Sequence, residues 1–306
     1  MIQIFQGDTR EILRTLPAES VQCCVTSPPY WGLRDYGVDN QIGLEATPEA
    51  FVANMVALFR EVKRVLRNDG TLWLNLGDSY NSQPGQRKPE DKIGTKQATN
   101  RGSNDTGSRF CPDLKPKDLV GIPWRVAFAL QADGWYLRSD IIWHKSNPMP
   151  ESVTDRPTKS HEYIFLLTKS ERYFYDADAI REPAEFGRRE WKDDHYKNGD
   201  IRIHHKGTTT GGDPSAGRNK RTVWTIATQP YKEAHFATFP EELAKLCILA
   251  GSKPGDLILD PFAGSGTTGK VAIELGRTAA LIELNPAYIK LINERTNVTL
   301  GLRLVA

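Results

Sequence analysis

Residues 26–37 read TSPPYWGLRDYG, and the start of this stretch carries groups that could work on the exocyclic amine of a nucleobase. Such an amine is a poor nucleophile because its lone pair is delocalised into the ring. The Ser27 hydroxyl and the Pro28 carbonyl could accept its hydrogens and free the lone pair for an electrophilic methyl group. Prolines fix φ and remove competing N–H donors. Tyr30 could stack on an extruded base, which returns roughly 1–3 kcal/mol of the extrusion cost.

A second stretch, LILDPFAGSGTTG at 257–269, has the pattern of a strand, a glycine turn and a helix start. Its G-x-G-x-x-G spacing begins at Gly264, and Glu283 follows about twenty residues later, where a carboxylate could accept both hydroxyls of a ribose. Taken alone, the motif fits a NAD site, another nucleoside cofactor, or a turn with no ligand. Asp260 at the mouth of the loop would oppose a pyrophosphate and suit an ammonium or sulfonium group.

Strand-like and helix-like segments alternate along the chain, which predicts an α/β fold with a doubly wound, mostly parallel sheet of the Rossmann-like type. The carboxyl ends of parallel strands share one edge of the sheet, so TSPPY and FAGSG should open into one crevice. We expect Asn68-Asp69-Gly70 to end the helix that precedes it. The predicted strands are IQIFQGD (ending in a turn), VQCCVT, TLWLNLGD, SDIIWHK, TVWTI, DLILD and AALIEL, and the apolar run HEYIFLLTKS lies between the fourth and fifth.

Composition narrows the class of protein further. The chain has 306 residues, a formal net charge of +2 and 39% hydrophobic residues, so contact with nucleic acid must come from local patches. Its four cysteines lack the spacing of a zinc site or a disulfide framework, and we expect no metal. No signal peptide or membrane span is predicted, which indicates a cytoplasmic protein; the family resemblance described below implies that its cell is prokaryotic or a phage-infected host.

Together, TSPPY and DPFAGSGTT in this order resemble the β (circularly permuted) class of amino-methylating DNA methyltransferases. The similarity covers most of the chain, including QGDTREILRTLPAESVQCCVTSPPY and GWYLRSDIIWHKSNPMPESVTDRPTKSHEYIFLLTKS. The resemblance implies the cofactor S-adenosyl-L-methionine and double-stranded DNA as substrate. It implies that catalysis by base flipping and in-line transfer depends on Ser27, Pro28, Pro29 and Tyr30.

The same resemblance implies which residues bind the cofactor. Asp8 would contact the adenine, Glu283 the ribose, and the segment HFATFPEEL the methionine end. The full set comprises Asp8, Thr238, Phe239, Asp260, Pro261, Phe262, Gly264, Ser265, Gly266, Thr267 and Glu283. Trp31 and Tyr36 fit either a lid over the base or plain packing.

Domain boundaries follow from composition and from the resemblance. Residues 1–80 would form the catalytic part, 81–118 a polar flexible loop that could clamp DNA, 119–169 the continued core, 170–225 the target-recognition region, and 226–306 the cofactor-binding part. Phosphate contacts supply much of the affinity for DNA. The cations expected to make them are Arg202, Lys206, Arg218, Lys220 and Arg221.

Several alternatives stay open. Serine at position 27 favours N4 of cytosine, because the N4 members of the class usually carry it, but N6 of adenine fits the same chemistry. A catalytically silent DNA-binding module is a more distant reading. C5-cytosine methylation is disfavoured because the chain has no Pro-Cys dipeptide. A homodimer and a cognate restriction endonuclease, not bound physically, are compatible with the resemblance.

Overall fold

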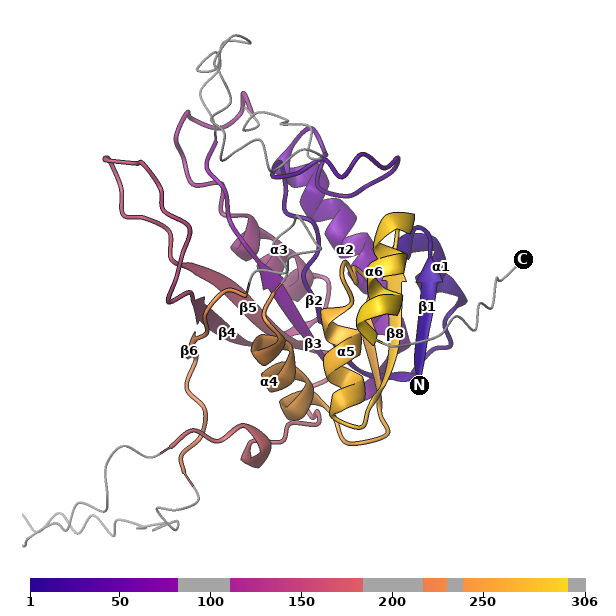
Figure 1. The fold of residues 1–306 in the computed structure, drawn as a ribbon. Helices are drawn as coiled ribbons and strands as arrows, with labels where there is room; N and C mark the ends of the chain where they lie inside the picture. Colours follow the sequence, from indigo (N-terminus) through magenta and orange to yellow (C-terminus); the bar gives the residue numbers. More distant parts are fainter. Residues whose placement is uncertain (82–110, 184–216, 230–238, 297–306) are drawn as a thin grey trace, which may run out of the picture.

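A computed structural model describes residues 1–81, 111–183, 217–229 and 239–296 of the chain. In these ranges, eight strands form one sheet in the order β1-β8-β7-β2-β3-β5-β4-β6 (Figure 1). The strands are β1 (Ile2–Gln6), β2 (Val21–Thr26), β3 (Leu66–Leu76), β4 (Tyr136–His144), β5 (His161–Thr168), β6 (Val223–Thr225), β7 (Leu257–Asp260) and β8 (Thr278–Glu283).

The sheet is parallel except at β5, which runs antiparallel to both β3 and β4. The predicted doubly wound, mostly parallel sheet is therefore confirmed, although the reversed direction of β5 was not predicted. The glycine motif follows β7, and β7 pairs directly with β2, which leads into the SPPY turn. Segments more than 230 residues apart thus end side by side at the carboxyl edge of the sheet.

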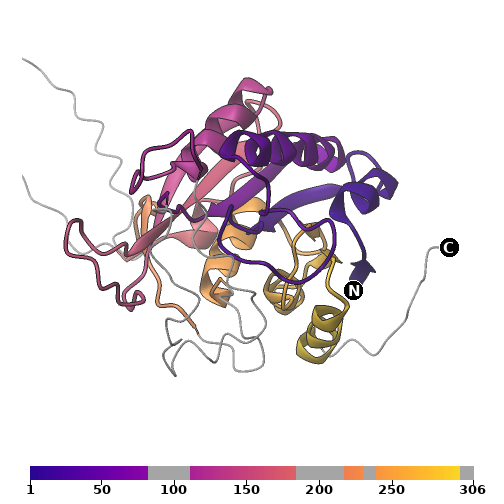
Figure 2. The same cartoon turned by 90° about the horizontal axis from the view of Figure 1, so that it is seen from above.

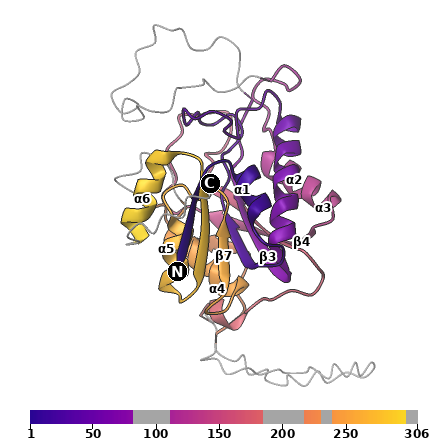
Figure 3. The ribbon, with the colours of Figure 1, turned by 90° about the vertical axis from the view of Figure 1, so that its right-hand side faces the viewer.

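Helices cover both faces of the sheet, as Figures 2 and 3 show. The helices α1 (Thr9–Thr15), α2 (Pro48–Val65) and α3 (Ile122–Ala132) pack on one face, and α4 (Glu241–Gly251), α5 (Thr267–Glu274) and α6 (Pro286–Thr296) on the other. Alternating strand residues supply the two cores, because successive side chains point to opposite faces. Cys24 lies in the core under α2 and Cys23 in the core under α4.

The helix α2 shows how the sequence specifies these elements. The Thr47 side chain accepts a hydrogen bond from Ala50 N (3.2 Å) and Pro48 occupies the first turn, which together start the helix. Phe51, Met55 and the other apolar residues at helical spacing are buried. The expectation that Asn68-Asp69-Gly70 ends this helix is wrong, because β3 begins at Leu66 and includes these residues.

Candidate active site

The SPPY turn and the glycine loop are joined by a buried carboxylate, Asp260 at the end of β7. Asp260 Oδ1 accepts from Thr26 Oγ1 at 2.7 Å and from Phe262 N at 3.1 Å, and its Oδ2 accepts from Thr268 Oγ1 at 2.6 Å. Burial raises the pKa of Asp260 to about 6. Only 1% of the residue is exposed, so the carboxylate lies behind the loop instead of at its mouth, where the sequence predicted it. Asp260 therefore fixes the two loops against each other.

The glycine loop is shaped around Glu283. Gly264 and Gly266 adopt φ of +53° and +80°, the left-handed region that glycine reaches without strain. Glu283 Oε2 accepts from Gly264 N and Oε1 from Asn285 N, both at 2.8 Å. Burial raises the pKa of Glu283 to about 7. Each carboxylate oxygen keeps a lone pair for a further donor.

This arrangement can hold a nucleoside cofactor. A Cβ atom added to Gly264 would meet nothing within 4 Å, so the backbone there is open to an approaching ligand. The spare lone pairs of Glu283 suit the two hydroxyls of a ribose. Tyr36 and Tyr288 lie near the Glu283 carboxylate, whose charge contributes to the raised pKa of both phenols, after burial in each case.

The loop is also held from α6. Arg295 donates to Ser265 Oγ at 2.8 Å and to Thr267 Oγ1 at 2.9 Å, and it pairs with Glu241 of α4 at 2.7 Å. Two residues predicted to bind cofactor, Ser265 and Thr267, thus use their side chains to anchor the loop. The sequence did not indicate Arg295, because an arginine in a terminal helix carries no motif.

Tyr30 is held tightly against β3. A Cβ atom added to Gly77 would lie 2.4 Å from Tyr30 Cε2, so the ring packs directly on the Gly77 backbone. Pro28 is buried, whereas Ser27 and Tyr30 are half-buried. Trp31 is 2% exposed and donates to the Glu45 carbonyl at 2.9 Å, which is the packing role.

Behind the turn lies a polar network that the sequence did not predict. Asn75 Nδ2 donates to Ser27 Oγ (3.2 Å), Tyr30 Oη (2.8 Å) and Glu162 Oε2 (3.0 Å). The Tyr30 hydroxyl donates to Glu162 Oε2 at 2.6 Å, and Lys145 Nζ pairs with Glu162 Oε1. The network joins the end of β2 to β3 and β5, so no stretch of the sequence contains it. The sequence signal for it was Asn75, a polar residue within the apolar strand LWLNL.

The remaining predicted residues have varied surroundings. Asp8 caps α1 by accepting from Arg10 N at 2.8 Å and pairs with the Arg10 guanidinium. Phe239 packs at the edge of the core under α4, and Phe262 at the edge of the core under α2. Thr238, Arg202 and Lys206 lie outside the described residues.

Two predicted DNA-binding cations form ion pairs in this structure. Glu182 Oε1 accepts from Arg218 Nε at 2.8 Å and from Arg221 Nε at 2.5 Å. The backbones of Glu182 and Arg218 also exchange hydrogen bonds of 3.0 and 2.8 Å. These contacts join the described segment that ends at residue 183 to the one that begins at residue 217, and they neutralise part of the cationic charge of Arg218 and Arg221.

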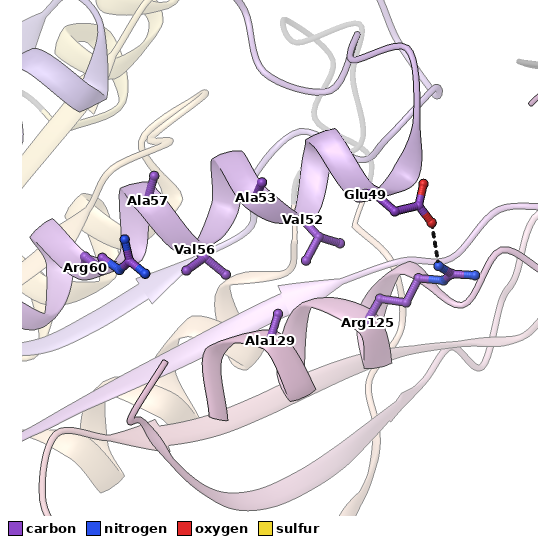
Figure 4. A pocket seen from close by; sticks show the side chains of 8 residues that line it. All are labelled: Glu49, Val52, Ala53, Val56, Ala57, Arg60, Arg125 and Ala129. Atoms are coloured by element: carbon purple, nitrogen blue, oxygen red, sulfur yellow. Dashed lines mark hydrogen bonds and ion pairs between the residues drawn. The ribbon is translucent and has the colours of Figure 1, made fainter. Parts of the chain in front are cut away.

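A separate groove lies between α2 and α3. Val52, Val56 and Ala129 line its middle, and an ion pair of 2.8 Å between Glu49 and Arg125 closes one end (Figure 4). None of the predicted site residues lines this groove. Within the described ranges, no helix is long and apolar enough to cross a membrane, and no group of three or more His, Cys, Asp or Glu side chains could hold a metal ion.

Comparison with known proteins agrees with this geometry. The family model of the N6/N4 DNA methylases matches residues 21–294. The chain is 51% identical over 301 residues to the Type II methyltransferase M.Cfr9I of Citrobacter freundii, an alignment that covers 96% of this chain and 89% of the relative.

Solved structures share the fold. The PvuII DNA methyltransferase (cytosine-N4-specific) aligns with a TM-score of 0.66 and 18% identity over 98% of this chain and 88% of its own. A putative DNA modification methylase from Thermus thermophilus, in complex with S-adenosyl-L-methionine, aligns at 0.59 and 24% identity over 97% and 95%. The chain therefore belongs to the N6/N4 DNA methylase family and is an S-adenosyl-L-methionine-dependent DNA methyltransferase that acts on an exocyclic amine, cytosine N4 or adenine N6.

Proposed function

We propose that the chain methylates N4 of cytosine in duplex DNA. The observation that carries this proposal is the neutral Ser27 hydroxyl at the end of β2, hydrogen-bonded to Asn75 and Tyr30 and adjacent to the glycine loop. A hydroxyl is a weaker acceptor than the carboxylate found in many amino-methyltransferases. N6 of adenine is the alternative acceptor, and the experiment below separates the two.

In the proposed mechanism, Ser27 Oγ and the Pro28 carbonyl accept the two hydrogens of the target amine. Pro28 and Pro29 hold the carbonyl in position, since their φ angles are fixed. The Tyr30 ring packs against Gly77 and would stack on the flipped base. S-adenosyl-L-methionine supplies an electrophilic methyl group when bound. Transfer is direct, without a covalent intermediate on the enzyme.

The cofactor would lie across the glycine loop. Glu283 would accept the ribose hydroxyls, Gly264 would allow the ligand to approach the backbone, and Asp8 would contact the adenine. Asp260 would position the glycine loop, because its hydrogen bond to Thr26 holds this loop beside Ser27. We retain Thr238, Phe239, Pro261 and Phe262 as proposed contacts of the methionine end and the adenosine.

We assign the proposed functions to consecutive ranges of the chain. Residues 1–80 and 119–169 would supply the catalytic half of the sheet, 226–306 the cofactor half, and 170–225 the contacts that read the DNA sequence. This order is that of the circularly permuted β class. Lys220, with Arg218 and Arg221 around Glu182, would contact the DNA backbone.

The acceptor base can be tested with substituted DNA. A genomic fragment is amplified with N4-methyl-dCTP in place of dCTP, or with N6-methyl-dATP in place of dATP, and an unmodified product serves as control. Incubation with tritiated S-adenosyl-L-methionine should label the control and the N6-methyladenine DNA but not the N4-methylcytosine DNA. The reverse pattern would overturn the assignment to cytosine.

A further inference from the structure

In the network behind the SPPY turn, each hydrogen bond has a defined donor and a defined acceptor. The Tyr30 hydroxyl donates its hydrogen to Glu162 Oε2 at 2.6 Å, because a carboxylate in an ion pair, as Glu162 is with Lys145, offers only acceptors. The Tyr30 oxygen is then an acceptor toward its other neighbours. Ser27 Oγ lies 3.4 Å from it and donates along this line, while Asn75 donates at 2.8 Å.

The consequence falls on Ser27. A serine hydroxyl has one hydrogen and two lone pairs. The hydrogen is used toward Tyr30, and one lone pair faces Asn75 Nδ2 at 3.2 Å, whose two hydrogens are shared among Ser27, Tyr30 and Glu162. One lone pair is left for the target amine, so Ser27 can meet the amine only as an acceptor. In this way a neutral hydroxyl takes the role that a carboxylate plays without help.

The charges around Glu162 agree with this assignment. Lys145 pairs with the other oxygen, Oε1, and the two side chains are 21% and 13% exposed. Lys159 and His161 also lie near Glu162. Burial lowers the pKa of each, and the negative charge of Glu162 offsets part of this lowering. Burial first, and then the Glu162 charge, hold the pKa of the Tyr30 phenol well above its usual value, so this phenol keeps its proton.

We propose that Glu162 is a positioning residue for methyl transfer: through Tyr30 it sets Ser27 as a hydrogen-bond acceptor and takes up the proton that the methylated amine must lose. The inference rests on the proposed function at the Ser27 turn. It adds Asn75 of β3, Glu162 of β5 and Lys145, the residue after β4, to a site so far composed of the ends of β2, β7 and β8.

The proton balance of this step is complete. The amine nitrogen forms its bond to the methyl carbon with its own lone pair, and the electrons of the broken C–S bond stay on sulfur. The nitrogen then releases one proton to Ser27 Oγ, and the N–H electrons return to it as a lone pair. Ser27 passes its own proton to Tyr30 Oη, and Tyr30 passes its proton to Glu162 Oε2. Positive charge thus moves from sulfur to nitrogen and on toward the one carboxylate of this network.

The test uses Glu162→Gln and Tyr30→Phe in the full chain, with Tyr163→Phe as the matched control. Tyr163 is the next residue on β5, and its ring packs against Phe165 and Trp124, outside the network. Single-turnover transfer of tritiated methyl to unmethylated plasmid DNA gives the rate constant. Quenching of tryptophan fluorescence gives the dissociation constant of S-adenosyl-L-methionine.

We expect Glu162→Gln and Tyr30→Phe each to slow the single-turnover step at least tenfold, with cofactor affinity within twofold of the wild type and Tyr163→Phe unchanged. The double variant should be no slower than the slower single variant, because both changes break one path. The solvent deuterium isotope effect of the wild type should be lost in both variants.

A rate within twofold of the wild type for either variant overturns the inference, as does multiplication of the two effects in the double variant. Tyr30→Phe keeps the ring and removes only one oxygen. The inference can therefore still be tested with this variant if Glu162→Gln does not fold. Because the tritium label counts transfer to any base, an error in the cytosine assignment leaves this test intact. Absence of transfer by the wild type would instead refute the proposed function.

Discussion

We predict that the buried Glu283 carboxylate, the proposed ribose contact, makes cofactor affinity depend on pH. Its pKa is raised to about 7 by burial, so the group titrates where most methyltransferase assays are run. In the proposed contact, the ionised carboxylate would offer acceptors to both ribose hydroxyls, whereas the protonated form would lose one of these acceptors. Lower pH therefore weakens binding. If only the ionised form binds, about one-eleventh of the protein is competent at pH 6 and about ten-elevenths at pH 8, so the apparent dissociation constant should differ about tenfold.

The assay is a fluorescence or calorimetric titration of the protein with S-adenosyl-L-methionine from pH 6 to pH 8. Glu283→Gln is the control, because its side chain does not titrate and any remaining slope belongs to the cofactor or to other groups. Asp260, Tyr36 and Tyr288 are the titratable groups near Glu283. A wild-type profile parallel to that of Glu283→Gln would refute the assigned role of this carboxylate.

Three further predictions follow from the site. Ser27→Ala should reduce methyl transfer on the order of 100-fold, the size typical of losing one aimed hydrogen-bonding group, and leave cofactor affinity unchanged; equal loss of both would contradict its role. Gly77→Ala should displace the Tyr30 ring, cost about 1–3 kcal/mol of stability in urea unfolding and slow transfer; unaltered stability would show that the ring can shift freely. Asp260 has its pKa raised to about 6, so its stabilising contribution is complete below its unfolded pKa near 4 and is lost as pH rises through 6. Asp260→Asn should therefore gain stability relative to the wild type by up to about 3 kcal/mol between pH 4 and pH 7, and a difference that does not vary with pH would refute this.

The sequence predicted the parts of the site that are encoded locally. TSPPY and FAGSG each lie within one strand-to-loop segment, and the alternation of strands and helices was enough to place both at one edge of the sheet. The glycine loop and Glu283 follow a known spacing, and in the structure Gly264 N donates a hydrogen bond to the Glu283 carboxylate.

Contacts between distant strands could not be predicted in this way. Asn75 meets Tyr30 because β3 pairs with β2, and Glu162 meets it because β5 runs antiparallel beside β3. Neither residue belongs to a motif. The position of Asp260 was wrongly expected at the mouth of the loop, because its partners Thr26 and Thr268 become neighbours only when β2 pairs with β7. The spacing of residues along the chain does not predict which strands pair.

The proposed transfer of a methyl group to N4 of cytosine can be tested by nucleoside mass spectrometry of methylated DNA. Unmethylated genomic DNA is incubated with the protein and trideuteromethyl S-adenosyl-L-methionine, then digested to nucleosides, with Ser27→Ala as the matched control. We predict deuterated N4-methylcytosine with the wild type and its near absence with Ser27→Ala. Deuterated N6-methyladenine as the product would contradict the claim.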